Sequence, residues 1–86
     1  MTTPVAFTPF GAWVVLKTSL DRGDHAQASE AARAIVAWLW QITLDGTDGK
    51  ARWELLDPSE RHGPDSRRLL ESRIQSVLAV YHRRAA

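Results

Sequence analysis

The stretch Asp24-His25-Ala26-Gln27-Ala28-Ser29-Glu30-Ala31-Ala32-Arg33-Ala34-Ile35-Val36-Ala37-Trp38-Leu39-Trp40-Gln41-Ile42-Thr43 decides the fold. It contains neither Gly nor Pro, and Asp24 and Gln27 have the spacing of a helical capping box. At about 100° per residue, its apolar side chains cover well over roughly 150° of a helix, which predicts contacts on more than one side. The sequence therefore predicts a central helix at about 24–43, whose apolar arc is Ala28, Ala31, Ala32, Ile35, Val36, Trp38, Leu39 and Ile42.

An earlier helix is predicted from Pro9 to about Asp21. Thr8 has the character of an N-cap, and proline is favoured at the first helical position because its missing N–H costs nothing there. The run Trp13-Val14-Val15-Leu16 leaves a short buried strand at 12–16 as an alternative. Gly23 ends the element in either case, and residues 1–7 are expected to be flexible.

The middle of the chain is harder to assign. Residues 45–50 form a turn or loop rich in Gly and Asp. Residues 51–56 are either a short helix or a strand, and a strand would form a hairpin over about 42–55. Asp57-Pro58-Ser59-Glu60 has the layout of a capped helical turn, which Gly63-Pro64 would stop.

The last element is the clearest amphipathic pattern. Leu70, Ile74, Val77 and Tyr81 recur at i, i+4, i+7 and i+11, and Asp65 or Ser66 can cap the helix. A C-terminal helix is therefore predicted at about 65–84. The whole chain, 1–86, is expected to be one all-α domain of three or four helices, with α+β as the alternative fold class.

The composition does not indicate a particular class of partner. The 86 residues carry a net charge of +1, which by itself implies neither nucleic acid nor membrane. No apolar run approaches the roughly 20 residues needed to cross a bilayer. The sequence has no cysteine, which fits a cytoplasmic protein and leaves dimerisation as a common way to enlarge a small core.

No catalytic or metal-binding motif can be assembled from the residues. His25, His62 and His82 lie far apart, so no two of them have the spacing of a helical metal site. Asp45 and Asp48 do not fit a calcium-binding loop in any register. We therefore expect no enzyme activity, no cofactor and no metal.

Four tryptophans point instead to protein binding, because tryptophan is enriched among the residues that dominate interfaces. Trp38 and Trp40 fall at opposite edges of the apolar arc of the central helix, so they are not expected to share a pocket. Trp40 and Trp53 are the candidate anchors for a protein partner, together with one face of the C-terminal helix that carries Leu70, Ile74 and Tyr81.

The arginines near the C-terminus do not favour a nucleic-acid partner. They spread around the predicted helix instead of forming one positive stripe, and a surface that follows a phosphate backbone concentrates its charge. They are expected to be solvated surface residues: Arg67, Arg68, Arg73, Arg83 and Arg84.

The segment Arg22-Gly23-Asp24-His25-Ala26-Gln27-Ala28-Ser29-Glu30-Ala31-Ala32-Arg33 resembles the helix junction of ribbon-helix-helix antitoxins of the ParD type. The resemblance implies a dimer that reads DNA with a two-stranded ribbon and binds a toxin through its C-terminal half. Val15, Leu16 and Leu20 would lie on that family's first helix, and Val5 to Thr8 near its strand. No DNA-contacting residue is assigned, because residues 4–8 hold no Lys, Arg, Asn or Gln to read base edges.

Overall fold

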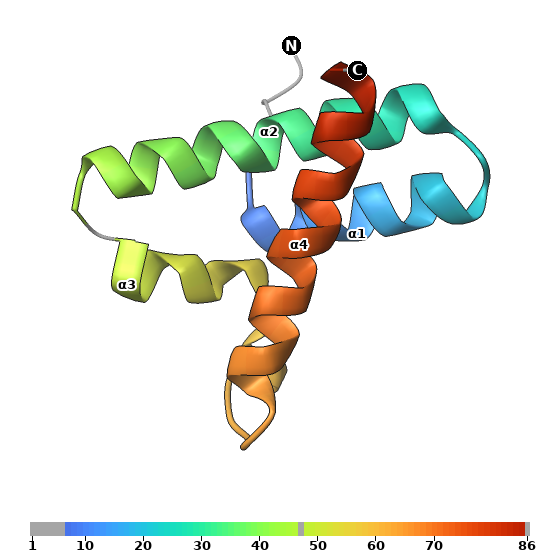
Figure 1. The fold of residues 1–86 in the computed structure, drawn as a ribbon. Helices are drawn as coiled ribbons and strands as arrows, with labels where there is room; N and C mark the ends of the chain where they lie inside the picture. Colours follow the sequence, from blue (N-terminus) through green and yellow to red (C-terminus); the bar gives the residue numbers. More distant parts are fainter. Residues whose placement is uncertain (1–6, 47, 86) are drawn as a thin grey trace, which may run out of the picture.

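The first two helices form an antiparallel hairpin (Figure 1). The computed structural model describes residues 7–46 and 48–85, and α1 spans Pro9–Asp21. The Thr8 hydroxyl accepts a hydrogen bond from the Gly11 N–H at 3.2 Å, so Thr8 is the N-cap. The predicted first helix is confirmed, and the alternative strand at 12–16 is wrong because these residues lie inside the helix.

A tight turn leads into α2, which spans His25–Leu44. Gly23 has φ +74°, a backbone conformation that glycine adopts without steric cost. The Asp24 carboxylate caps the helix by accepting from the Gln27 N–H at 3.1 Å. The Gln27 side chain accepts hydrogen bonds from Ser19 Oγ at 2.8 Å and Arg22 Nη2 at 3.1 Å, which tie the two helices together. The predicted central helix is confirmed.

Of the two alternatives for residues 51–56, the short helix is confirmed and the strand, with its hairpin over 42–55, is wrong. After α2 the chain forms a short helix α3, Asp48–Ala51, and a 3-10 helix η1, Arg52–Leu55. Leu55 and Leu56 are both fully buried, although a strand would point successive side chains to opposite faces. The helical turn that ends at Leu55, followed by extended backbone at Leu56, allows both side chains to enter the core.

A second 3-10 helix and a long C-terminal helix complete the fold. The expected helical turn forms as η2, Pro58–Glu60, with the Asp57 and Glu60 side chains making a full capping box. Helix α4 spans Ser66–Ala85, in agreement with the predicted C-terminal helix. Within the described ranges the chain contains no β-strand, so the domain is all-α, with four α-helices as expected.

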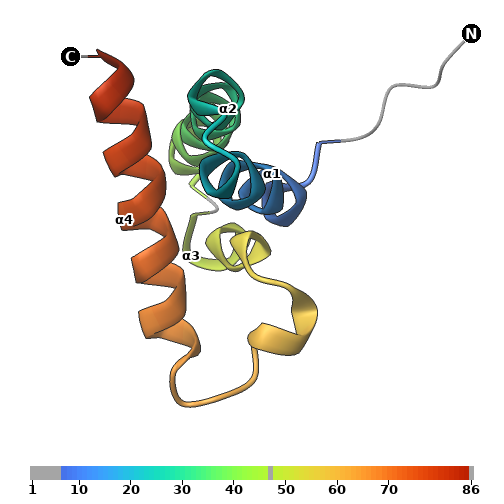
Figure 2. The same cartoon turned by 90° about the vertical axis from the view of Figure 1, so that its right-hand side faces the viewer.

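Helix α4 runs across the α1–α2 hairpin, and the turns of α3 and η1 lie beneath α2 (Figures 1 and 2). Small alanines on α2, with Ala28 and Ala32 at 0% exposure, leave room for neighbouring helices to approach closely. The buried apolar core draws on α1, α2, η1 and α4 and consists of Trp13, Leu16, Ala31, Ala32, Ile35, Leu55, Leu56, Leu70 and Val77.

The strand implied by the ribbon-helix-helix resemblance is only partly covered by the structure. Val5 and Ala6 lie outside the described residues, whereas Phe7 and Thr8 have no regular secondary structure. Val15, Leu16 and Leu20 do lie on the first helix, as the resemblance implies. Helix α4 packs across the two helices that the resemblance covers.

Arg73 connects α4 with η1, η2 and α1 through its side chain. Its guanidinium donates to the Leu55 carbonyl at 3.1 Å and to both Glu60 carboxylate oxygens at 2.9 and 2.7 Å. It also lies over two aromatic rings of α1, 5.7 Å from the centroid of Phe10 and 5.2 Å from that of Trp13. The expectation that Arg73 is a solvated surface residue is wrong, since it is only 8% exposed and holds α4, η1, η2 and α1 together.

The hydrogen bond from Arg73 lowers the pKa of Glu60 below its ordinary value of 4.5, and the hydrogen bond from the Asp57 backbone N–H adds to this effect. A carboxyl group with a lowered folded-state pKa stabilises the native state above its unfolded pKa. That contribution is lost as the pH falls through the lowered pKa of the folded state.

We therefore expect the free energy of unfolding to fall as the pH drops below about 4.5, and the Glu60→Gln variant to show a shallower fall. Denaturant unfolding between about pH 3 and 7, followed by far-UV circular dichroism, measures this fall in the free energy of unfolding. Identical pH slopes in the wild type and the variant would contradict the assigned role of Glu60.

Replacing Arg73 by Ala removes the partner of Glu60 and of the Leu55 carbonyl. We expect this change to lower the free energy of unfolding by at least about 2 kcal/mol, as for buried hydrogen bonds that involve charged groups. Arg68→Ala is the matched control, because Arg68 is an exposed arginine of the same helix. Arg68→Ala is expected to change the free energy of unfolding by no more than about 0.5 kcal/mol. Equal effects of the two changes would rule out a special role for Arg73.

Candidate protein-interaction surface

One side of α2 faces away from the core and carries large apolar side chains. Its exposed residues recur at intervals of three and four, so they form a single stripe. The centre of this stripe lies about 200° around the helix from the buried Ile35, on the opposite side. Trp40 is 67% exposed and Leu44 is 75% exposed, one helical turn apart. We call this stripe the α2 outer face and define it as Glu30, Arg33, Ala34, Ala37, Trp40, Gln41 and Leu44.

The C-terminal half of the α2 outer face is hollowed. A shallow, open cavity of about 310 Å³ is lined by Ala37, Trp40, Gln41 and Leu44. Gln41 Nε2 donates to the Asp45 carboxylate at 3.1 Å, so polar groups border the apolar side chains at this end of the helix. Figure 1 shows this half of α2, in green, at the edge of the molecule and away from the crossing of α4.

The other expected anchors lie elsewhere. Leu70 is 4% exposed and belongs to the core, while Ile74 and Tyr81 are partly buried against it. The stripe of the C-terminal helix therefore packs within the domain. Tyr81 makes an edge-to-face ring contact with His82 at 5.6 Å.

The structure brings three of the expected residues together in a second cavity. Trp53, Leu70 and Ile74 line a space of about 240 Å³ between η1 and α4. Gly49, Arg52, Arg67 and Glu71 complete its lining. Trp53 is partly buried and packs against the core, so it offers less surface to a partner than Trp40 does.

Sequence reasoning missed Leu44 and Ala37. It placed Trp40 at the edge of one broad apolar arc and did not treat the opposite side of the helix as a second apolar stripe. The signal was available in the spacing of Ala37, Trp40 and Leu44, which is the i, i+3, i+7 spacing of a helix-packing seam.

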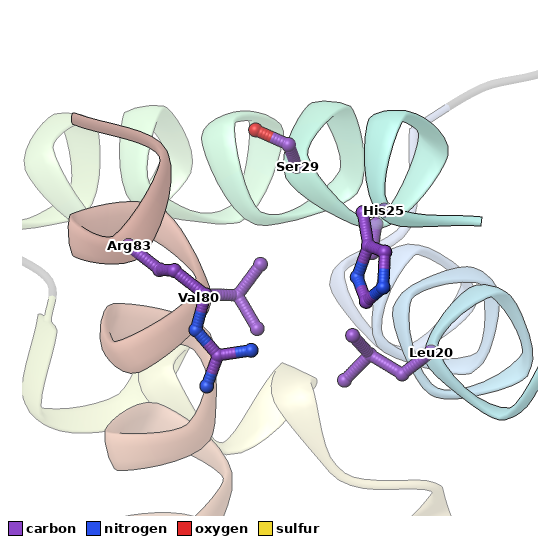
Figure 3. A pocket seen from close by; sticks show the side chains of 6 residues that line it. Leu20, His25, Ser29, Val80 and Arg83 are labelled. Atoms are coloured by element: carbon purple, nitrogen blue, oxygen red, sulfur yellow. The ribbon is translucent and has the colours of Figure 1, made fainter. Parts of the chain in front are cut away.

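A third cavity lies between the hairpin turn and the end of α4 (Figure 3). It measures about 290 Å³ and is lined by Leu20, His25, Ala28, Ser29, Val80 and Arg83. Leu20 and Val80 face each other across it, and the His25 and Arg83 side chains are exposed and form no hydrogen bond with each other (Figure 3). Ser29 and His25 carry the hydroxyl and imidazole groups of its lining, and they form no hydrogen bond with each other.

The described residues contain neither a cluster suited to a metal ion nor a membrane-spanning helix. No group of three or more His, Asp or Glu side chains there is placed to hold a metal ion. In the same part of the chain, every helix is too short or too polar to cross a membrane.

Comparison with known proteins finds no matching family model, no matching curated protein and no matching solved structure.

The exposure of Trp40 and Leu44 predicts that neither residue supports the fold of the single chain. We expect Trp40→Ala and Leu44→Ala each to change the free energy of unfolding by no more than about 0.5 kcal/mol. Leu55→Ala should cost about 2–5 kcal/mol, because Leu55 is fully buried. Denaturant unfolding measures all three, at a concentration at which the wild type is monomeric. A loss of stability in Trp40→Ala as large as that in Leu55→Ala would place Trp40 in the core.

Proposed function

We propose that this chain is a non-catalytic interaction domain that binds a helical segment of a protein partner through the α2 outer face. The observation that carries the proposal is the exposure of Trp40 and Leu44 side by side on one helix. Burying a side chain of this size is worth about 1.5–3 kcal/mol. Two such side chains in neighbouring positions form an apolar patch of the kind that marks interaction sites.

The layout of the face favours a helix as the bound element. Its apolar members recur at intervals of three and four residues on one side of α2, which matches the way an amphipathic helix places anchors at i, i+3, i+4 and i+7. Ala34 and Ala37 are small, so the backbone of a second helix can approach there. Trp40 and Leu44 would then pack against side chains of the bound helix that flank its closest approach to α2.

The charges on the face favour a protein over a nucleic acid. Glu30 and Arg33 have opposite signs, and Gln41 is neutral, so the face has no concentration of positive charge to attract phosphates. Polar residues around apolar anchors resemble the rim of a protein interface.

A binding experiment on the native partner tests the proposal. The partner is captured from the source cells, identified, and its affinity for the purified domain is measured by calorimetry. We expect Trp40→Ala and Leu44→Ala each to weaken binding, with Trp40→Ala costing about 2 kcal/mol, or roughly 30-fold in Kd.

Val14→Ala is the matched control, because Val14 is an exposed apolar residue on α1, outside the α2 outer face. Its expected effect on Kd is small. The proposal fails if the captured protein binds Trp40→Ala and Leu44→Ala as tightly as the wild type. A salt-dependent DNA gel shift that is unaffected by Trp40→Ala would favour the DNA-binding antitoxin instead.

A further inference from the structure

We infer that the cavity between the hairpin turn and the end of α4 binds a small monocarboxylate that has a short apolar tail. The residues that line this cavity come from α1, α2 and α4, and they are Leu20, His25, Ala28, Ser29, Val80 and Arg83 (Figure 3). None of them belongs to the α2 outer face, so this site is independent of the proposed function.

The inner part of the cavity is apolar. Ala28 is buried on α2, while Leu20 of α1 and Val80 of α4 are half-buried and face each other across the space (Figure 3). The volume of about 290 Å³ is close to the smallest that small-molecule sites usually have. At about 30 Å³ for each non-hydrogen atom, it suits a ligand of roughly ten such atoms or fewer. An apolar tail would gain hydrophobic free energy by leaving water for this space.

Three polar side chains line the same cavity without a hydrogen-bond partner among the described residues. Ser29 is 8% exposed and its hydroxyl forms no such bond, whereas the buried Ser19 hydroxyl of α1 donates to Gln27 at 2.8 Å. A hydroxyl at this depth usually has a partner. The His25 and Arg83 side chains likewise form no hydrogen bond or ion pair with the described part of the chain. All three groups are therefore available to a ligand.

These polar groups match a carboxylate. The Arg83 guanidinium is positively charged and can donate two parallel hydrogen bonds to one carboxylate group. Figure 3 shows this guanidinium and the His25 ring on opposite sides of the cavity, so donors approach it from both α4 and α2. No Asp or Glu is among the described residues that line the cavity, so no carboxylate of the chain itself competes for these donors.

The composition of the lining favours a monocarboxylate with a tail over an inorganic anion. The one guanidinium of the lining offsets one negative charge, and half of the lining residues are apolar. Inorganic phosphate would contact the donors and leave Leu20, Ala28 and Val80 without a contact. A carboxylate on a short apolar chain would use both parts of the cavity.

Titration with hexanoate, followed in two-dimensional amide NMR spectra, tests this site. We expect the largest changes in chemical shift at the residues that line the cavity, and a Kd of about 1 mM because the ligand is small. Hexanamide has the same tail without the charge, and it should bind about fivefold more weakly. Butanoate should bind about tenfold more weakly, because two fewer methylene groups are buried.

Arg83→Gln removes the positive charge at the rim of the cavity. It should weaken hexanoate binding about fivefold and leave the fold intact, because Arg83 is exposed. Arg68→Gln is the matched control, since Arg68 is exposed on the same helix and does not line the cavity. His25→Ala removes a second donor and should weaken binding about threefold. Far-UV circular dichroism checks that each variant is folded, and His25→Ala replaces Arg83→Gln should the latter be unfolded.

The outcomes decide the site without reference to the α2 outer face. Shift changes at the lining residues that depend on the carboxylate, on the tail and on Arg83 support it. The site is overturned if hexanoate changes no lining resonance well above the expected Kd, or if hexanamide or inorganic phosphate binds as tightly as hexanoate. An equal loss of binding in Arg68→Gln and Arg83→Gln also overturns it. The capture experiment with Trp40→Ala tests the proposed function separately.

Discussion

The fold depends on one buried guanidinium. Between α2 and α4 the chain has only the short α3 and two 3-10 turns, none of which is long enough to be stable as an isolated helix. Arg73 reaches from α4 to the Leu55 carbonyl and the Glu60 carboxylate, and its planar group lies against the rings of Phe10 and Trp13. Because these contacts converge on one side chain, the connecting segment is held to both the first and the last helix.

This arrangement explains how so short a chain surrounds a core. Leu55 and Leu56 are carried by the connecting segment, yet they are as deeply buried as Leu16 and Ile35 of the long helices. A segment without extensive secondary structure can place two leucines in the core only if its own backbone polar groups are satisfied. The hydrogen bonds from Arg73 to Leu55 and from Arg61 to Leu56 satisfy two carbonyl groups at that point.

The long helices could be predicted because their signals are local. Each long helix is indicated by residues that are close together in the sequence. These are Thr8 and Pro9 for α1, Asp24 and the alanines that follow it for α2, and the repeat from Leu70 to Tyr81 for α4. Arg73 could not be predicted, because its partners lie 13 and 18 residues earlier and its burial depends on how α4 crosses the hairpin. The choice between a helix and a strand at residues 51–56 stayed open for the same reason, since the pattern of these residues is ambiguous until the core that receives Leu55 and Leu56 is known. The candidate site was predicted through Trp40 alone. Leu70 has a clear amphipathic pattern, but that pattern does not tell a face packed within the domain from one that awaits a partner.

Helix α2 carries two sets of side chains that face in opposite directions. Ala28, Ala32 and Ile35 hold the domain together, while Trp40 and Leu44 face solvent and contribute little to its core. Since the two sets share one backbone but few contacts, changes in the outer set leave the inner set intact, and their effects on folding should be nearly additive with changes in the core. On the proposed function, this separation would let the chain acquire a new binding preference by single substitutions along the outer face, without passing through variants that fail to fold.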